Sequence, residues 1–224
     1  GEPTGVFAHN PEPLPKNIRQ ICKEIKNGKF DLGIVVDPDV DRLVFVDENG
    51  EPFGEEYTLV AVSDYVLSKS PGNTVSNLSS TKALKLVTEK RNGNYYPAAV
   101  GEVNVVAKMK EVAAVIGGEG NGGIIYPELH YGRDALVGIA LFLSSLAQFS
   151  RPASMLRSQY PNYYISKNKI EIESEINIEV ILERLKERYS KHPISIIDGL
   201  KIDFDDEWVH LRKSNTEPII RIFA

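Results

Sequence analysis

The sequence predicts an α/β protein in three successive parts: the end of one α/β domain, a complete α/β domain with a mostly parallel sheet, and a C-terminal α+β domain with a largely antiparallel sheet. Two observations support this prediction. Up to residue 151, short β-rich runs alternate with helix-length amphipathic segments, as in parallel sheets covered by helices. Beyond it, one helix stands among several short strands separated by turn signals. We therefore place the domains at 1–52, 53–151 and 152–224.

The composition is that of an ordinary globular protein. The 224 residues are 42% hydrophobic and 25% charged, with a formal net charge of -5. This charge argues against a general nucleic-acid binder, and no apolar run reaches the roughly 18–20 residues of a membrane helix. The single cysteine, Cys22, permits no internal disulfide and falls on the apolar face of an expected helix, so we expect it to pack in a core. With no recognisable signal peptide, a cytoplasmic location is expected.

The first part is expected to contain one helix and two strands. A helix from Pro15 to Gly28 is predicted because apolar residues repeat there at helical spacing, namely Ile18, Ile21, Cys22 and Ile25. Two apolar, β-rich runs follow, near residues 34–36 and 43–46. Asn49-Gly50 then favours a tight hairpin turn.

Three aspartates occupy the connection between those two strands: Asp37, Asp39 and Asp41, followed by Arg42. In an extended chain alternate residues point to one face, so the three carboxylates can converge on a hard cation such as Mg²⁺. A plain acidic turn is the alternative. With Glu48, the aspartates also match the spacing of a calcium-binding EF-hand loop. That interpretation is excluded because Arg42 stands where the loop needs glycine, and because strands rather than helices flank it.

The middle part alternates between helices and strands. Helices are expected near 55–68, 82–90, 104–111 and 134–150, and strands near 74–78, 95–100 and 113–116. The last of these strands runs into residues 117–123, five glycines in seven residues around Glu119 and Asn121. Such a run lets backbone lie close to a ligand, and ligands of open α/β sheets gather at the carboxyl ends of strands. We expect a ligand loop here, with a tight connection as the alternative.

The last part follows a boundary at Arg151-Pro152 and a linker up to Pro161. Its helix is expected near 178–189, and its strands near 163–172, 194–197, 200–204, 208–211 and 219–223. Between the last two strands lies R-K-S-N-T-E-P, residues 212–218, with Arg221 just after. Arginine forks match phosphate oxygens in pairs and loop N–H groups add donors. A phosphate cradle and a solvated polar hairpin are both consistent with this segment.

The D-P-D-V-D-R, G-E-G-N-G and R-K-S-N-T-E-P loops, in this order and spacing, resemble the α-D-phosphohexomutase family. That family contains phosphoglucomutase, phosphomannomutase and phosphoglucosamine mutase. The resemblance covers essentially the whole chain, as the end of the family's second domain, all of its third and nearly all of its fourth. It implies transfer of phosphate between the 1- and 6-positions of a hexose, through a phosphoserine and a hexose bisphosphate.

The resemblance also implies a role for individual positions. Arg42 would be a catalytic residue beside a Mg²⁺ ion held by Asp37, Asp39 and Asp41. Sugar hydroxyls would bind Glu119 and Asn121. The non-reacting phosphate would be held by Arg212, Ser214, Asn215, Thr216 and Arg221.

Departures from the family pattern limit the transfer of roles. Some members carry histidine at the positions of Glu102 and Gly123, so no general base is assigned; the nearby candidates are Lys82, Glu102, His130 and Arg133. The family's serine motif, T-A-S-H-N-P, is missing, and residues 8–11 match only its second half. We therefore expect this chain to be an inactive fragment, whose partner is the missing N-terminal domains of the same enzyme.

Two other functions stay open. A non-catalytic phosphosugar-binding module would use the glycine and arginine loops for binding without turnover. A magnesium-dependent phosphatase could be built on the aspartates, but a nucleophilic aspartate motif with its usual flanks is missing. The G-E-G-N-G variant and residues 100–102 favour bacterial or archaeal phosphoglucosamine or phosphomannose enzymes over animal phosphoglucomutases.

Overall fold

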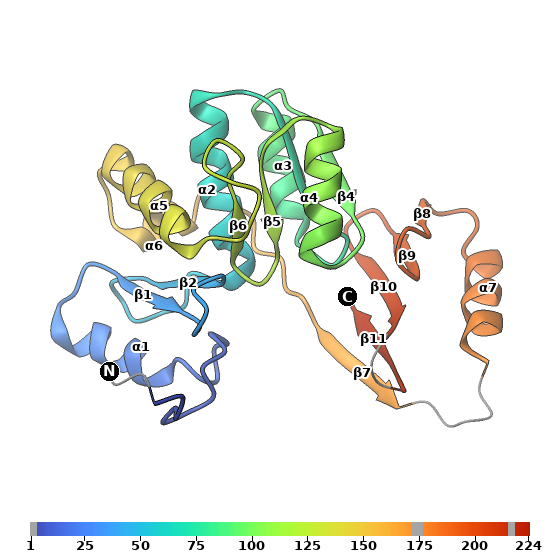
Figure 1. Cartoon of the computed structure of the whole chain (residues 1–224), viewed down its shortest axis with the longest axis horizontal. Coiled ribbons are helices and arrows are strands. Elements are labelled where there is room, and N and C mark those ends of the chain that lie inside the picture. Colours follow the sequence, from blue (N-terminus) through green and yellow to red (C-terminus); the bar gives the residue numbers. More distant parts are fainter. Residues whose placement is uncertain (1–3, 172–176, 215–217) are drawn as a thin grey trace.

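The computed structural model describes residues 4–171, 177–214 and 218–224. The elements form three groups along the chain, each with its own sheet (Figure 1). The fold class predicted from the sequence is confirmed, because a partial α/β domain is followed by an α/β/α domain with a mostly parallel sheet and by an antiparallel C-terminal sheet.

The first group is a helix packed on a two-stranded hairpin. Helix α1 spans Arg19–Gly28, and strands β1 (Gly33–Val36) and β2 (Leu43–Val46) are antiparallel. The helix begins later than predicted, because the N–H groups of Asn17 and Ile18 donate to Leu14 O and close a turn over Pro15. Cys22 packs in the small core predicted for it, together with Ile18, Ile25, Val44 and Val46.

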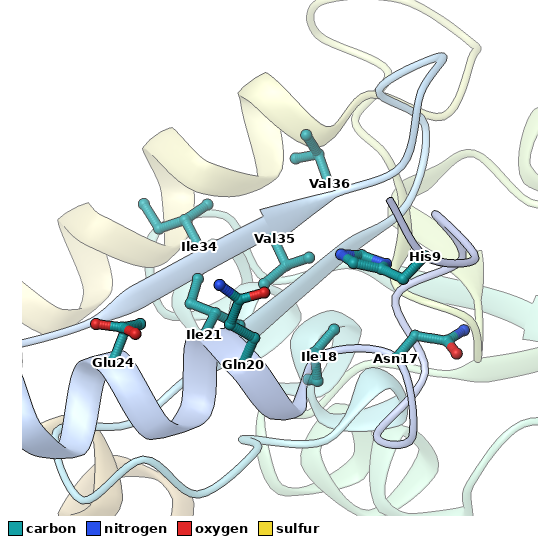
Figure 2. A pocket seen from close by; sticks show the side chains of 9 residues that line it. All are labelled: His9, Asn17, Ile18, Gln20, Ile21, Glu24, Ile34, Val35 and Val36. Carbon is teal, nitrogen blue, oxygen red and sulfur yellow. The ribbon is translucent and has the colours of Figure 1, made fainter. Parts of the chain in front are cut away.

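Strand β2 is buried at all four residues, whereas β1 exposes Ile34 and Val36. Phe45 of β2 stacks on Phe142 of the middle domain, with ring centroids 3.7 Å apart. On the other side of the hairpin, β1 and α1 border an apolar groove of about 490 Å³, where Ile21 lies beside the strand (Figure 2). Within the described chain this groove stays open.

The middle domain has a four-stranded sheet with the order β4-β3-β5-β6. Its strands are β3 (Asn73–Asn77), β4 (Tyr95–Ala98), β5 (Ala114–Glu119) and β6 (Gly123–Ile125). Its helices are α2 (Glu55–Lys69), α3 (Lys82–Lys90), α4 (Glu102–Glu111) and α5 (Ala135–Phe149). Strand β3 is parallel to β4 and β5, and β6 is antiparallel to β5. The main apolar core fills this domain and includes Leu43 and Phe45 from β2.

Two elements in and just after the middle domain were not predicted. Residues 117–119 belong to β5 and Gly123 begins β6, so the glycine-rich segment is a β-hairpin with a turn over 120–122 rather than a long loop. The expected linker after Arg151 contains a short helix, α6 (Ala153–Arg157). It forms because Ala153 and Leu156 are buried, the latter in the main core.

The C-terminal sheet is antiparallel throughout, with the order β7-β11-β10-β9-β8 (orange to red in Figure 1). Its elements are β7 (Lys167–Glu171), α7 (Ile178–Arg188), β8 (Ile194–Ser195), β9 (Leu200–Asp203), β10 (Trp208–Lys213) and β11 (Ile219–Phe223). Lysines join this sheet to the middle domain. Lys82 Nζ donates to Glu207 O at 3.1 Å, and Lys201 Nζ donates to Leu78 O at 3.0 Å. A search of the described residues finds no helix with the length and apolar character to cross a membrane.

Candidate functional site

The loop between β1 and β2 brings its three carboxylates together. One carboxylate oxygen from each of Asp37, Asp39 and Asp41 lies within 4.8 Å of the other two. The backbone makes a turn instead of the extended path assumed from the sequence, because Val40 N–H donates to Asp37 O at 3.1 Å and Val40 has a φ of 60°. A β-branched residue in this conformation is strained. Ala135 N–H, which donates to Val40 O at 3.0 Å, holds it in place.

Hydrogen bonds and burial give the aspartates different proton affinities. Asp37 Oδ1 accepts the N–H groups of Asp41 at 3.0 Å and Arg42 at 2.9 Å. Burial raises the pKa of Asp37, but these N–H groups outweigh it and the net pKa is lowered. Burial raises the pKa of Asp41 to about 6, opposed by the positive charge of Arg133 and reinforced by Asp37.

The donor set fits a divalent cation. Asp41 Oδ1 is buried and has no hydrogen-bond partner in the described part of the chain. A buried oxygen in this state is costly unless a ligand meets it. Several carboxylate oxygens on one loop are the ligands that Mg²⁺ and Ca²⁺ prefer, and the short loop with few protein ligands suits the smaller Mg²⁺.

Arg42 ties the acidic loop to the N-terminal loop. Its Nη1 pairs with Glu12 Oε1 at 2.8 Å, and its Nε lies 3.7 Å from Asp37 Oδ2 and 3.9 Å from Asp41 Oδ1. The guanidinium therefore adds positive charge directly beside the carboxylate cluster.

Arg133, just before α5, contacts carboxylates from three separate segments. Its Nη1 lies 3.1 Å from Glu119 Oε2, its Nε lies 3.1 Å from Glu102 Oε2, and its Nη2 pairs closely with Asp41 Oδ2. Its side chain is only 16% exposed. The sequence placed Arg133 and Glu102 among general-base candidates. The structure instead pairs them, and a guanidinium stays protonated and cannot act as a base at neutral pH.

The two other base candidates have structural contacts. His130 Nε2 lies 3.0 Å from Asp134 Oδ2, and Asp134 Oδ1 caps helix α5 by accepting the N–H groups of Leu136 and Val137. Lys82 donates to backbone carbonyls across the junction with the C-terminal sheet. These contacts explain both side chains without a role in proton transfer.

Glu119 is buried and well supplied with donors. Its Oε1 accepts from Asn77 Nδ2 at 3.0 Å and from Gly101 N at 3.2 Å, and its Oε2 accepts from Arg133. Asn121 Oδ1 accepts the N–H of Gly123 at 3.2 Å, which closes the turn of the hairpin. The carboxylate of Glu119 is thus held in one orientation by contacts from three segments.

Internal packing explains the glycines of the hairpin. Gly122 has a φ of +87°, its carbonyl accepts Leu43 N–H at 3.2 Å, and a Cβ there would lie 2.2 Å from Leu43 O. A Cβ at Gly123 would lie 2.5 Å from Arg133 Cδ. The glycines therefore let the hairpin lie against β2 and Arg133, so a sugar-binding role for the hairpin rests on Glu119 and Asn121 rather than on glycine content.

Arg212 and Arg221 are direct partners across strands β10 and β11. Cross-strand partners point to the same face of a sheet, and like charges in this arrangement are destabilising. Asp198 offsets part of this charge, because its Oδ2 lies 3.1 Å from Arg212 Nε. The pair is suited to an anion. Ser214 is buried and closes the hairpin by donating its N–H to Ile219 O at 2.9 Å, while Asn215 and Thr216 lie outside the described residues.

His210 and Asp198 belong to this region, but no sequence motif marks either of them as a site residue. His210 is fully buried, with Nδ1 2.8 Å from Ser79 Oγ of the middle domain and Nε2 2.5 Å from Asp198 O. Burial lowers the pKa of His210, which favours the neutral ring. Only the pairing of two distant segments gives these residues their place, so a single sequence could not reveal them.

One series of polar contacts joins the arginine pair to the acidic loop. Asp198 Oδ2 also accepts the N–H of Val100 at 3.0 Å, and the next residue, Gly101, donates to Glu119. The full series runs through Arg212, Asp198, Val100-Gly101, Glu119, Arg133 and Asp41. One residue from each predicted set, Asp41 for the cation, Glu119 for the sugar and Arg212 for the phosphate, therefore belongs to one connected arrangement.

Fold and site together define a class of multi-domain α/β proteins with a carboxylate cluster on one loop and a cross-strand arginine pair in the C-terminal sheet. Residues 54–163 match the family model of phosphoglucomutase/phosphomannomutase α/β/α domain III, and residues 1–50 match that of domain II. The chain belongs to the phosphoglucomutase/phosphomannomutase family.

Curated relatives agree over nearly the whole chain. The phosphoglucomutase/phosphomannomutase of Thermococcus kodakarensis is 37% identical over 226 residues, which cover 99% of this chain and 49% of that protein. The phosphoglucosamine/phosphogalactosamine mutase of Sulfurisphaera tokodaii is 33% identical over 222 residues, which cover 97% of this chain and 49% of that protein. The chain thus spans about half the length of the curated relatives it matches.

Solved structures share the fold. A phosphoglucomutase/phosphomannomutase family protein from Burkholderia thailandensis has a TM-score of 0.83 and 25% identity, covering 96% of this chain and 47% of that one. The N-acetylphosphoglucosamine mutase of Aspergillus fumigatus, solved in complex with GlcNAc-6P and magnesium, has a TM-score of 0.59 and 14% identity, covering 85% of this chain and 47% of that one. The second likeness concerns the fold alone.

Proposed function

We propose that this chain is part of a magnesium-dependent phosphohexomutase, an intramolecular phosphotransferase that interconverts hexose 1-phosphates and 6-phosphates through a phosphoserine. The observation that carries the proposal is the connected arrangement of the carboxylate cluster, Glu119 and the arginine pair. Relatives named for phosphoglucose, phosphomannose and phosphoglucosamine chemistry support it.

The acidic loop would hold the metal ion through Asp37, Asp39 and Asp41. The orphaned Asp41 Oδ1 supports this role. A bound Mg²⁺ would offset the negative charge of a phosphoryl group during transfer. Arg42 would add a second positive charge on the same side of the cluster, which is why we propose it as a catalytic residue.

The hairpin and the arginine pair would hold the two ends of the substrate. Glu119 has three protein donors, and a carboxylate offers about four acceptor sites, so it retains capacity for a sugar hydroxyl beside Asn121. The non-reacting phosphate would be held by Arg212, Ser214, Asn215, Thr216 and Arg221. A single phosphate anchor lets the sugar bind in both orientations, as transfer to either the 1- or the 6-position requires.

Calorimetric titration of the chain with hexose phosphates tests this proposal. In the presence of Mg²⁺, glucose 1-phosphate, mannose 1-phosphate or glucosamine 1-phosphate is expected to bind. Arg212→Gln is expected to weaken binding roughly ten- to hundred-fold, because a charge-assisted contact to phosphate is lost. The matched control is Lys213→Gln. Its Nζ pairs with Glu179 at 3.0 Å, and neighbouring strand residues point to opposite faces, so affinity should not change. Absence of binding by all three sugars, or equal losses in the two variants, would contradict the proposal.

The partner we propose is the N-terminal domains of the same enzyme, which would supply the serine. The relatives' double length and the open apolar groove between α1 and β1 (Figure 2) support this. Mixing the chain with the N-terminal half of a full-length relative should then yield mutase turnover. The alternative, a non-catalytic phosphosugar-binding module, would bind ligand without turnover in the same mixture.

Several expectations from the sequence stay predictions. They are the domain limits 1–52, 53–151 and 152–224, the lack of nucleic-acid and membrane partners, and the cytoplasmic location.

A further inference from the structure

We propose that Arg133 is a positioning residue that couples cation binding at the acidic loop to sugar binding at the β5–β6 hairpin. The inference rests on the proposed function and concerns how its two subsites communicate. It begins from an imbalance of charge: one guanidinium contacts Asp41, Glu102 and Glu119, three carboxylates from three segments.

The backbone of Arg133 is fixed beside the hairpin. An isolated antiparallel bridge pairs Arg133 with Ile125 of β6, and Arg133 N–H donates to Glu102 Oε1 at 3.1 Å. Glycine at position 123 leaves the space that the arginine side chain crosses, since a Cβ there would lie 2.5 Å from Arg133 Cδ. The backbone is thus held in place, and the side chain lies within reach of all three carboxylates.

The cation and Arg133 compete for Asp41, and this competition explains why cation binding should raise the affinity for sugar. Arg133 is 16% exposed, Asp41 18% and Glu119 7%, so their charges interact with little screening by solvent. A divalent cation on the acidic loop neutralises Asp41 and repels the guanidinium. Arg133 is then held more strongly by Glu102 and Glu119. Because Glu119 is thereby fixed in the orientation that Asn77 and Gly101 already support, less ordering is required when a sugar hydroxyl binds.

Linkage makes the effect reciprocal. If the cation raises the affinity for sugar by some factor, the sugar raises the affinity for the cation by the same factor. Arg42 provides the matched comparison, because it also lies beside Asp37 and Asp41 but pairs on its other side with Glu12 of the N-terminal loop. Removing its charge should change cation affinity and leave the coupling intact.

The experiment measures the affinity of the chain for glucose 6-phosphate by calorimetry, once with MgCl₂ and once with EDTA. In the wild type, Mg²⁺ is expected to raise the affinity about five-fold or more, the usual lower range of site-to-site coupling. In Arg133→Gln this ratio should fall to about one, while glucose 6-phosphate and, in a separate titration, Mn²⁺ each still bind. In Arg42→Gln the ratio should match the wild type.

Two further variants separate coupling from a general loss of structure. Gly123→Ala keeps every charge but displaces the Arg133 side chain, so it should lower the ratio as Arg133→Gln does. Arg133→Lys keeps the charge without the fork and should give an intermediate ratio. Circular dichroism melts establish which variants are folded. One folded variant of Arg133 or Gly123 is enough to test the coupling.

The outcomes distinguish this inference from the proposed function. If glucose 6-phosphate and the hexose 1-phosphates fail to bind the wild type, both fail. If binding occurs and Mg²⁺ does not change the affinity, only the coupling role is overturned. The coupling role is also overturned if the effect of Mg²⁺ on affinity survives in Arg133→Gln and Gly123→Ala. That second result would mean that the metal contacts the sugar phosphate directly.

Discussion

The acidic loop and the arginine pair, the two ends of the contact series, are supported in different ways. The acidic loop depends on long-range contacts: Val40 is strained, Ala135 holds it, and the side chain of Arg133 reaches Asp41 from the middle domain. The arginine pair depends on strand register, which sets Arg212 opposite Arg221 whatever their side chains contact.

This difference predicts which properties a mutation should change at each of the two sites. A change near the acidic loop should alter stability, cation binding and the hairpin together, because the same contacts serve all three. A change at the arginine pair should alter anion binding and leave stability nearly unchanged, because backbone hydrogen bonds of the sheet hold the residues.

The largest effect on stability near the acidic loop is expected for Gly122→Ala. The new Cβ would lie 2.2 Å from Leu43 O at a φ of +87°, so the hairpin must move away from β2 and lose the Leu43 N–H bond. We expect the free energy of unfolding to fall by about 4 kcal/mol, with weaker cation binding. Urea denaturation measures it. The control is Gly101→Ala, where φ is +113° but the nearest atom is 3.6 Å away, so only backbone strain of about 1–2 kcal/mol is expected. Equal losses in both variants would show that the contact with β2 is unimportant.

Glu56 makes the stability of this region depend on pH. Its Oε2 accepts the N–H of Thr81 at 2.9 Å. Its carboxylate also lies against Gly120 of the hairpin, where a Cβ would be 2.3 Å from the carboxylate oxygens. Burial raises the pKa of Glu56 from 4.5 to about 8, opposed by Lys167. The folded chain then holds a proton that the unfolded chain releases, so stability is full below pH 4.5 and falls as pH rises towards 8.

We expect this loss to be about 4 kcal/mol between pH 4.5 and 8, and Glu56→Gln should remove it, since the amide keeps an acceptor oxygen and cannot ionise. Thermal melts of both proteins across this pH range measure the difference. A parallel pH profile for wild type and Glu56→Gln would contradict the assignment.

Asp39→Asn tests the cation role without a structural cost. Asp39 is exposed, unlike Asp37, so we expect unfolding free energy to change by less than about 0.5 kcal/mol. Affinity for Mn²⁺ should fall roughly ten-fold or more, because one anionic ligand is lost. Asp31→Asn, an acidic residue just ahead of β1 and outside the loop, is the control, and titration with Mn²⁺ is the measurement. An unchanged affinity in Asp39→Asn would remove this residue from the ligand set.

A small effect on stability is also expected for Arg212→Gln. It removes one of two facing like charges and also leaves Asp198 without its partner at 3.1 Å, so the two effects nearly cancel and unfolding free energy should change by less than about 1 kcal/mol. Urea denaturation beside the phosphosugar titration measures it. A large destabilisation would mean that this end, too, depends on side-chain contacts.

Much of the fold could be predicted because local patterns determine it. Helix α3 occupies residues 82–90 as expected, and the chain turns ahead of β9 at an Asp-Gly pair, a typical turn sequence, with a φ of +75° at Gly199. Helix α6 was missed because five residues carry too little periodicity, and its stability comes from burial in a core that the sequence does not display.

The candidate site was only partly predictable. Its charged residues stand in short motifs, so Asp37, Asp39, Asp41 and Glu119 could be named as candidates from the sequence alone. The contacts of Arg133 could not be, because they join residues 41, 102, 119 and 133, whose proximity depends on the fold. For the same reason the sequence could not show that the glycine run packs against Leu43 and Arg133.

Anomalous diffraction from crystals of the chain grown with Mn²⁺ and glucose 6-phosphate tests the central claim most directly, because it locates metal and ligand in one measurement. We predict a single strong peak coordinated by Asp37, Asp39 and Asp41, a sugar against Glu119, and a phosphate between Arg212 and Arg221. A peak elsewhere, or a phosphate that avoids both arginines, would contradict the assignment of this site to a phosphohexomutase.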